Sequence, residues 1–264
     1  MIAAGMFSMN SCAFFELDNY DAPEETLKGR VVDMDGNPVL TDQGSEGIRV
    51  RLMDLEWEEM GGQVTPQDFY CKMDGTFQNT KLFPGSYNVT VDGPFVPLVM
   101  DDANGVPIKD RSQTIEINGV TEIEFQVQPF LKVEFVDYPS VADGIITAKV
   151  KVTRAISRQD LADEIGQTGD WEESYANITD IQLFVSYSST VGYKARDEYW
   201  SGQIRFDGSE FDSQEGDVIE ITSNAEHPIP SGRHLFVRAA ARINYQTANV
   251  ARYNYSDVME VIVP

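Results

Sequence analysis

Hydrophobic and polar residues alternate with a period of two along most of the chain after Thr26. This alternation is typical of β-strands that bury one face and expose the other. The segment 48–53 alternates aliphatic residues with Arg49, Arg51 and Met53. In the segment 235–243, aliphatic residues at odd positions alternate with Arg238, Ala240 and Arg242, so we expect a half-buried strand there.

The strand pattern divides the chain into two parts. The first predicted strands end near residue 127, and seven more follow, at about 131–137, 145–154, 181–187, 200–206, 217–222, 234–243 and 257–263. Seven short strands separated by turns are typical of an immunoglobulin or fibronectin-type sandwich. The one helix we predict runs from Ser157 to Ile165, with Ser157 as its N-cap. The fold class is therefore all-β, with two β-sandwich domains at 26–129 and 130–264.

The first domain carries turn motifs in a recognisable order. They are Gly29-x-Val31-x-Asp33 followed by Gly36 and Pro38, then Asp74-Gly75-Thr76-Phe77, then Leu82-x-Pro84-Gly85-x-Tyr87. Over about residues 26–91 these motifs resemble the regulatory β-sandwich appended to carboxypeptidases. That module is similar to transthyretin in fold, and the resemblance implies a domain without catalytic activity.

The N-terminal segment is similar to the end of a lipoprotein signal peptide. Residues 1–11 carry no charge and lead to Cys12, the position that such a signal would have acylated. Residues 12–25 contain five acidic residues and form a predicted tether, which resembles the acidic export signal of surface lipoproteins in the Bacteroidetes. We expect lipid anchoring at the outer membrane, with cell-surface exposure favoured over a periplasm-facing orientation, and no other membrane attachment.

Composition excludes several functions. Lys and Arg number 20 against 43 Asp and Glu, which gives a net charge of −23 that repels nucleic-acid phosphates. The histidines number two, and the chain has no Gly-x-Ser-x-Gly, His-Glu-x-x-His or Cys-x-x-Cys motif, so we predict no catalytic residues, no metal site and no cofactor. Chance carboxylate pairs leave a hydrolase as a minor alternative. The second cysteine, Cys71, falls on a predicted inward face and is expected to be a buried thiol.

Aromatic residues in predicted loops are the candidates for ligand binding. A sugar ring has an apolar face that stacks on Trp or Tyr while its hydroxyls bind polar neighbours. Trp57 and Trp171 are both flanked by acidic residues, which prefer water, so we expect exposed indoles. The candidate glycan-binding residues are Trp57, Trp171, Tyr175, Tyr199 and Trp200. Packing of these rings under their own loops is the alternative, and since Tyr199 and Trp200 start a predicted strand, one of them is expected in the core.

Nearly the whole chain resembles a family of two-domain Bacteroidetes lipoproteins of unassigned function, often encoded beside starch-utilisation-type glycan importers. The resemblance implies a polysaccharide ligand and outer-membrane importer proteins as partners, and it implies no enzyme. An adhesin or fimbrial structural subunit is the alternative, because lipidated two-domain fimbrillins are also similar, with Arg30 as the candidate cleavage site in the first strand. An importer scaffold is a further alternative.

Overall fold

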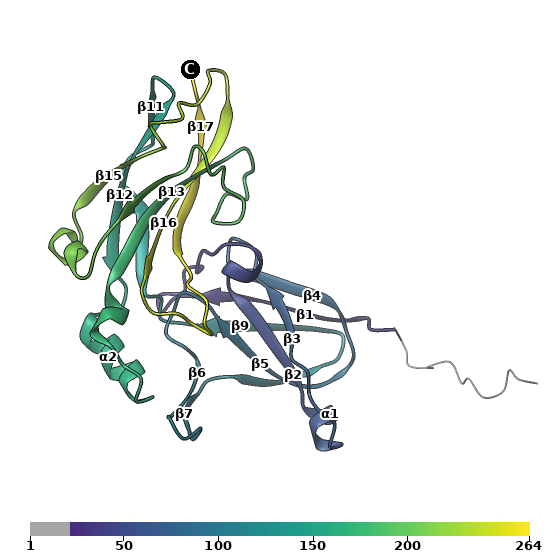
Figure 1. Ribbon diagram of the computed structural model, residues 1–264. Coiled ribbons are helices and arrows are strands. Elements are labelled where there is room, and N and C mark those ends of the chain that lie inside the picture. The colour runs from purple at the N-terminus through teal and green to yellow at the C-terminus, as the bar shows by residue number, and fades with distance from the viewer. Residues whose placement is uncertain (1–21) are drawn as a thin grey trace, which may run out of the picture.

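The computed structural model describes residues 22–264, so Cys12 and most of the predicted tether lie outside the described residues. The described chain folds into two β-sandwiches that lie end to end (Figure 1). The predicted all-β fold class is confirmed. No helix in this part of the chain has the length and apolar character to cross a bilayer.

The first sandwich consists of two facing sheets. One sheet has the order β4-β1-β9, in which β1 (Glu25–Val32) pairs antiparallel with β4 (Thr76–Leu82) and parallel with β9 (Val120–Gln126). The other has the order β3-β2-β5-β8. Its strands are β2 (Arg49–Asp54), β3 (Gln67–Tyr70), β5 (Gly85–Asp92) and β8 (Gln113–Ile117). A separate hairpin of β6 (Val99–Asp101) and β7 (Pro107–Asp110) lies at the side of this sandwich and contacts the segment 158–166 of the second domain through Lys109 and Glu164.

Period-two alternation holds well in this domain because each sheet has one core face and one solvent face. Val50 and Leu52 of β2 are fully buried, as are Val89 and Val91 of β5. Cys71 is also buried, although it lies just after β3 rather than on it. The segment around Trp57, expected as a loop, forms a short helix, α1 (Leu55–Glu59). Asp54 caps it by accepting the Trp57 N–H at 3.0 Å.

The second sandwich pairs a sheet around β12 with the sheet β14-β13-β16-β17. In the first of these, β12 (Ile145–Arg154) pairs with β10 (Leu131–Phe135), β11 (Ser140–Ala142) and β15 (Val218–Thr222). The other contains β13 (Ile178–Ser186), β14 (Gly202–Arg205), β16 (His234–Ile243) and β17 (Asn254–Ile262). The predicted helix is confirmed as α2 (Arg158–Gly166), with Ser157 accepting the Asp160 N–H. The three-residue strand β11 adds to the seven strands that the sequence predicted.

One prediction about β16 was wrong. Its outer face was expected to be exposed, but Arg238 is 1% exposed and Ala240 is fully buried. A third apolar cluster covers this face, with Phe184, Tyr253 and Tyr255 at its centre and Val191 and Tyr193 contributed by the loop after β13. Leu40 of the first sandwich packs on the same cluster. Alternation along one strand carries no information on a loop or a neighbouring domain that covers the outer face.

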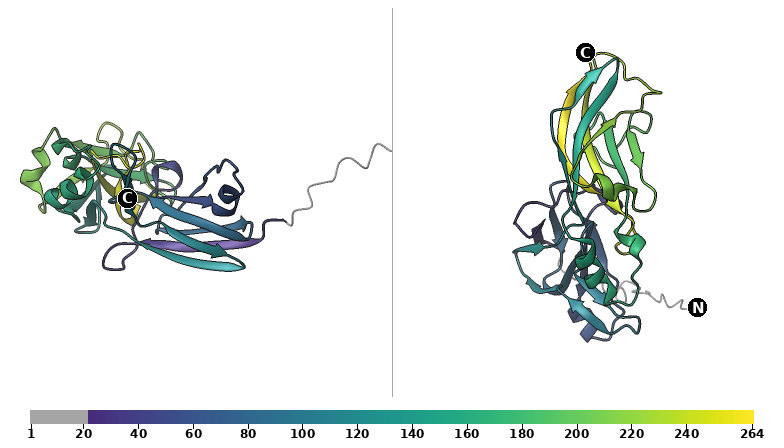
Figure 2. Two further views of the ribbon diagram at one scale, coloured as in Figure 1. Left: turned by 90° about the horizontal axis from the view of Figure 1, so that it is seen from below. Right: turned by 90° about the vertical axis from the view of Figure 1, so that its left-hand side faces the viewer.

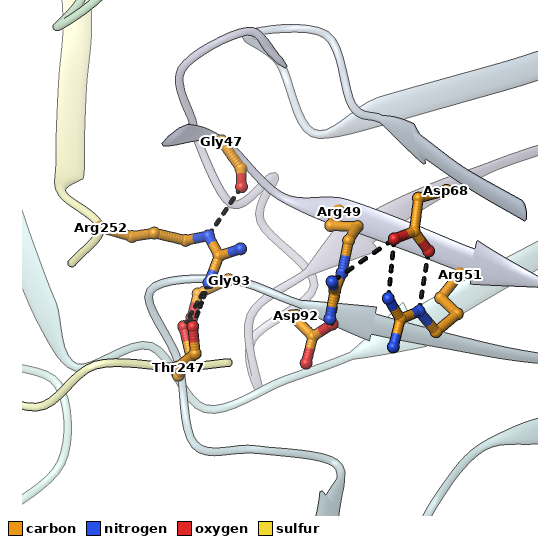
Figure 3. Close-up of polar contacts among 8 residues, drawn as sticks. All are labelled: Gly47, Arg49, Arg51, Asp68, Asp92, Gly93, Thr247 and Arg252. Atoms are coloured by element: carbon orange, nitrogen blue, oxygen red, sulfur yellow. Dashed lines mark hydrogen bonds and ion pairs between the residues drawn. The ribbon is translucent and has the colours of Figure 1, made fainter. Parts of the chain in front are cut away.

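Buried polar contacts join the two sandwiches. Arg252, just before β17, donates from Nε to the carbonyl of Gly47 at 2.9 Å, and Thr247 donates to the carbonyl of Gly93 at 2.7 Å (Figure 3). Arg238 donates to the carbonyl of Thr41 at 2.8 Å, and the hydroxyl of Tyr255 donates to Asp42 at 3.3 Å. We call this set of contacts the junction. Since hydrogen-bonded buried groups tolerate little displacement, the junction fixes the two sandwiches relative to each other.

The same view shows a charged network on the outer face of the sheet β3-β2-β5-β8 (Figure 3). Arg51 donates to both oxygens of Asp68 at 2.8 Å, and Arg49 bridges Asp68 and Asp92. The hydrogen bond from Arg51 lowers the pKa of the Asp68 carboxyl. These paired groups rigidify the sheet surface, because bidentate arginine–carboxylate pairs fix both partners.

Candidate functional site

The five aromatic residues predicted for ligand binding lie at three separate places. Trp57 is on α1 of the first sandwich, at the end remote from the second sandwich (Figure 1). Trp171 and Tyr175 lie between α2 and β13. Tyr199 and Trp200 lie in the turn that precedes β14, rather than at the start of a strand as predicted. No single surface therefore contains all five.

Trp57 is an isolated exposed indole. Its side chain is 52% exposed, as the flanking acidic residues predicted. The ring rests against the backbone of Gly62, where an added Cβ would lie 2.2 Å from the indole Nε1. Neighbouring side chains on α1 are Glu56, Glu58 and Glu59. One ring with a glycine beneath it offers a single stacking face.

Trp171 and Tyr175 belong to a chain of packed rings. Trp171 is half-buried and contacts Tyr175 edge-on at 6.0 Å between ring centroids, and Tyr175 contacts Tyr245 at 5.6 Å. Tyr245 in turn contacts the buried Phe130 at 5.9 Å. Burial, with Asp170 nearby, raises the pKa of Tyr245 to about 12. These contacts hold the loop between α2 and β13 onto the second core, which is the alternative that the sequence left open for these rings.

Tyr199 and Trp200 form the third group, together with residues that are distant in the sequence. Trp200 contacts Tyr187 edge-on at 5.4 Å between centroids, and Tyr199 contacts His227 at 5.3 Å. Arg233 lies over the Tyr187 ring at 5.8 Å. We call Tyr187, Tyr199, Trp200, His227 and Arg233 the distal aromatic cluster. It lies where β13 ends, β16 begins and β17 ends, because Ser186 pairs with Phe236 and Phe236 with Glu260. Figure 1 shows this end of the second sandwich, marked by the C-terminus, remote from the first sandwich.

Exposure distinguishes this cluster from the packed rings around Trp171, and the number of its exposed rings distinguishes it from the isolated Trp57. Tyr199 is 69% exposed and Tyr187 is 53% exposed, and His227 and Arg233 are exposed as well. Trp200 is half-buried and packs against the second core. The expectation that one residue of the Tyr199–Trp200 pair enters the core is thus met by Trp200. The cluster presents two tyrosine rings to solvent on a base that the core holds in place.

Backbone hydrogen bonds order the turn that carries Tyr199 and Trp200. One oxygen of Asp197 accepts the N–H of Tyr199 at 2.9 Å and that of Trp200 at 3.1 Å. The Asp197 N–H donates to the carbonyl of Val185 on β13 at 2.7 Å, and the Asn224 N–H donates to the carbonyl of Trp200 at 2.9 Å. An aspartate that closes a turn in this way is a standard device for fixing loop geometry. These bonds therefore fix the backbone from which the Tyr199 and Trp200 side chains extend.

The chemistry available at the cluster is stacking plus hydrogen bonding. The ring faces of Tyr187 and Tyr199 are apolar, while both tyrosine hydroxyls, the His227 imidazole and the Arg233 guanidinium donate or accept hydrogen bonds. This combination fits a pyranose, which has one apolar face and a rim of hydroxyls. Across the described residues, no group of three or more His, Cys, Asp or Glu side chains is arranged to hold a metal ion.

Three members of the cluster, Tyr187, His227 and Arg233, were not among the binding residues predicted from the sequence. Tyr187 follows directly after β13, while His227 and Arg233 belong to the connection between β15 and β16. Their convergence depends on the pairing of β13 with β16, in which Ser186 lies opposite Phe236. Of the three, Tyr187 alone had a local signal for a surface ring, because it ends the predicted strand 181–187 and is followed by Ser188 and Ser189.

The described chain is thus a tandem β-sandwich protein with an ordered aromatic surface at one end. A family model described as the N-terminal domain of a protein of unknown function, DUF3823, matches residues 25–128. A DUF3823 family structure from Bacteroides uniformis is 53% identical, covers 92% of this chain and 100% of its own, and has a TM-score of 0.87. The chain therefore belongs to the DUF3823 family.

Two more distant structures share the fold. A DUF3823 family protein from Parabacteroides merdae is 19% identical, with 91% of this chain and 100% of that chain covered and a TM-score of 0.62. A second Bacteroides uniformis protein, provisionally assigned as carbohydrate-binding, is 17% identical, with the same coverage and a TM-score of 0.65. A search of curated proteins finds no match.

Proposed function

We propose that this protein is a non-catalytic glycan-binding lipoprotein of the bacterial surface and that the distal aromatic cluster contacts the glycan. The observation that carries the proposal is the pair of exposed rings, Tyr187 and Tyr199, ordered around Trp200 and surrounded by hydrogen-bonding groups. Neighbouring exposed aromatic rings that are surrounded by polar groups are typical of a ligand or interaction surface. The provisional assignment of the second Bacteroides uniformis structure is consistent with the proposal.

The charge of the protein favours a neutral glycan over an anionic one. The chain carries a net charge of −23, so an anionic polysaccharide is repelled at long range. A neutral glycan has no such penalty, and its affinity comes from stacking and hydrogen bonds. Binding of one sugar by a few aromatic rings is weak, and the affinity grows when several sugars of one chain are engaged.

The anchoring half of the proposal rests on Cys12 and the acidic residues after it. An acylated Cys12 holds the protein at the outer membrane, and the tether places the two sandwiches outside the lipid surface. In such a position the protein passes glycan to importer proteins of the same membrane. Metabolic labelling with an alkyne-tagged fatty acid tests this: label on the wild-type chain and none on Cys12→Ser supports lipidation, while equal labelling of both overturns it.

Native affinity gels that contain a panel of polysaccharides test whether the protein binds glycan. The panel includes neutral α-glucans, β-glucans, mannans and xylans, with a polygalacturonate as the anionic comparison. Retardation by a neutral polysaccharide that is lost in a Tyr187→Ala, Tyr199→Ala double variant supports the proposal. Tyr138→Ala is the matched control, because Tyr138 is a 66% exposed tyrosine of the same sandwich outside the cluster. Retardation of the double variant equal to that of the wild-type chain overturns the assignment of this site.

A further inference from the structure

A groove runs along the boundary between the two sandwiches. Two adjoining cavities make it up, with volumes of about 470 Å³ and about 640 Å³. Met34, Gln128 and Ala155 line both cavities, so the two adjoin at this point. Each volume falls within the range of roughly 300–1,000 Å³ that is usual for ligand sites, and domain boundaries are a frequent place for such sites. None of the five aromatic residues predicted for binding lines it.

Contacts between the two domains fix the width of the groove. Lys109 of the β6–β7 hairpin forms an ion pair with Glu164 of α2 at 2.7 Å, and its side chain is 15% exposed. Gln128 donates from its amide to the carbonyl of Ala155 at 2.7 Å, which joins the first domain to the second. Within the first domain, Gln126 donates to the carbonyl of Met34 at 3.1 Å. Together with the junction, these bonds make the groove a preformed rather than an induced site, which lowers the entropic cost of binding.

Hydrogen-bonding capacity remains on the groove surface. Gln126 and Gln128 use their amide nitrogens in the bonds above, which leaves the side-chain oxygens as acceptors. Arg111 also lines the groove, and within residues 22–264 no carboxylate lies at ion-pair distance from it. The Met34 side chain is 51% exposed and supplies an apolar surface at the middle. The lining thus combines acceptors, a free guanidinium and one apolar contact.

The charge of the lining selects against anions. Four basic residues are Lys109, Arg111, Lys132 and Arg154, and three of them are already paired with carboxylates. The acidic residues of the lining number seven: Asp33, Asp35, Glu134, Asp160, Asp163, Glu164 and Asp257. Carboxylates accept hydrogen bonds from sugar hydroxyls but repel sulfate, phosphate and uronate groups.

We propose that this groove is a second glycan site, which holds a short run of a neutral polysaccharide. The inference rests on the proposed function, since it assumes that glycan is the ligand of the protein, but it uses none of the residues of the distal aromatic cluster. One site in this groove and another at the far end of the second sandwich allow one polysaccharide, or two chains, to be held at two points. Two linked weak sites raise the overall affinity well above that of either one.

Ala155 offers a way to block the groove without removing a contact. Its side chain is a single exposed methyl group where the two cavities meet, and its hydrogen bonds use the backbone alone. Ala155→Trp therefore fills the groove. Thr80→Trp is the matched control, because Thr80 is exposed on β4 and lines neither cavity. Circular dichroism and melting temperature check that both variants fold.

The test uses maltohexaose, cellohexaose and mannohexaose as neutral probes and hexagalacturonate as the anionic one. The wild-type chain carries ¹³C-methyl methionine, and Met34→Leu assigns the Met34 resonance. We expect a saturable shift of this resonance with at least one neutral probe and a smaller or no shift with hexagalacturonate. In calorimetry, Ala155→Trp is expected to weaken the groove-binding event about tenfold or more, and Thr80→Trp to leave it unchanged.

The outcomes separate this inference from the proposed function. A probe that binds the wild-type chain but leaves Met34 unshifted and binds Ala155→Trp equally well overturns the groove site alone. Loss in Ala155→Trp with full binding in the Tyr187→Ala, Tyr199→Ala double variant supports the groove and overturns the distal cluster. Absence of binding by every probe contradicts both. If Ala155→Trp fails to fold, the Met34 shift in the wild-type chain decides the question.

Discussion

The Nε atom of Arg252 lies 2.9 Å from the carbonyl oxygen of Gly47, and this hydrogen bond crosses from the second sandwich to the first (Figure 3). Arg252 is 5% exposed and also donates to the carbonyl and the hydroxyl oxygen of Thr247, which itself is bonded to Gly93. Burial lowers the pKa of Arg252, and the partners within hydrogen-bond distance are neutral oxygens. The guanidinium therefore joins the backbone at Gly47 to that at Thr247, and the Thr247 hydroxyl extends the link to Gly93. Figure 2 shows the two sandwiches in the orientation that these bonds help to fix.

Replacing Arg252 is expected to weaken the coupling between the two sandwiches. Arg252→Ala leaves the carbonyls of Gly47 and Thr247 buried without their donor, so the free energy of unfolding should fall by about 2–4 kcal/mol. Calorimetry should show one cooperative transition for the wild-type chain and two separated transitions for the variant. Arg205→Ala, at an exposed position of β14, is the control and should keep the wild-type profile. A single unshifted transition in Arg252→Ala would contradict the role of the junction.

Acid should weaken the second sandwich through Asp180. Burial by itself raises the pKa of this carboxyl, but hydrogen bonds from Tyr253 and Gln182 and the charge of Arg242 outweigh burial and leave the pKa below 3.8. A pKa that is lower in the folded state gives stability that is full above the unfolded value and is lost as pH falls through the folded value. The gap in unfolding free energy between the wild-type chain and Asp180→Asn should therefore shrink as pH falls below about 4.

Urea unfolding at neutral and acid pH measures this gap. Asp217→Asn serves as the control, because Asp217 is exposed and its substitution should leave the pH dependence of the wild-type chain in place. A gap between the wild-type chain and Asp180→Asn that stays constant across this pH range would show that the Asp180 carboxylate contributes no pH-dependent stability.

Cys71 is expected to be inert in the folded protein. Its side chain is 2% exposed, and burial, with Asp74 nearby, raises the pKa of the thiol to about 12. Because the thiolate is the reactive form, a thiol reagent at pH 8 should modify Cys71 in urea but hardly at all in the native state. A Cys12→Ser background leaves Cys71 as the remaining cysteine for this assay. Native labelling at the unfolded rate would contradict the burial.

The peptide bond after Arg30 should resist an arginine-specific protease. Arg30 lies on β1, which is hydrogen-bonded to β4 on one side and β9 on the other, and its side chain pairs with Glu124 at 2.6 Å. A protease needs an extended, detached segment, so we expect native cleavage to fall in connecting loops rather than at Arg30. Early cleavage at Arg30 followed by ladders of polymer would favour a fimbrial subunit instead.

Sequence patterns predicted the interior of this protein better than its surfaces. Alternation in β2 and β5, and the Ser157 cap of α2, depend on neighbours within one strand or one helical turn, and the structure agrees with each. The outer face of β16 depends on Leu40 and on the loop after β13, which lie far away in the sequence. The prediction of an exposed Arg238 was wrong because a polar residue in a strand does not show whether another domain supplies its hydrogen-bond partners.

The candidate site shows the same limit. Flanking acidic residues correctly indicated an exposed Trp57, yet the same pattern around Trp171 accompanies a half-buried ring. The charges there reach water while the indole turns toward Tyr175. Tyr199 and Trp200 were identifiable as loop aromatics, but their neighbours Tyr187, His227 and Arg233 come from two other connections. Strand pairing, which local sequence does not specify, brings them together.

The central claim is that the distal aromatic cluster binds glycan. The most direct test is calorimetric titration of the protein with an oligosaccharide of the polysaccharide that retards it in the affinity gels. Tyr199→Ala removes a ring that is 69% exposed, so folding should be unaffected while the association constant falls about tenfold, equivalent to about 1.4 kcal/mol. Trp57→Ala, which removes an exposed indole from the first sandwich, should bind like the wild-type chain. Equal affinity of the wild-type chain and Tyr199→Ala, or a loss confined to Trp57→Ala, would contradict the claim.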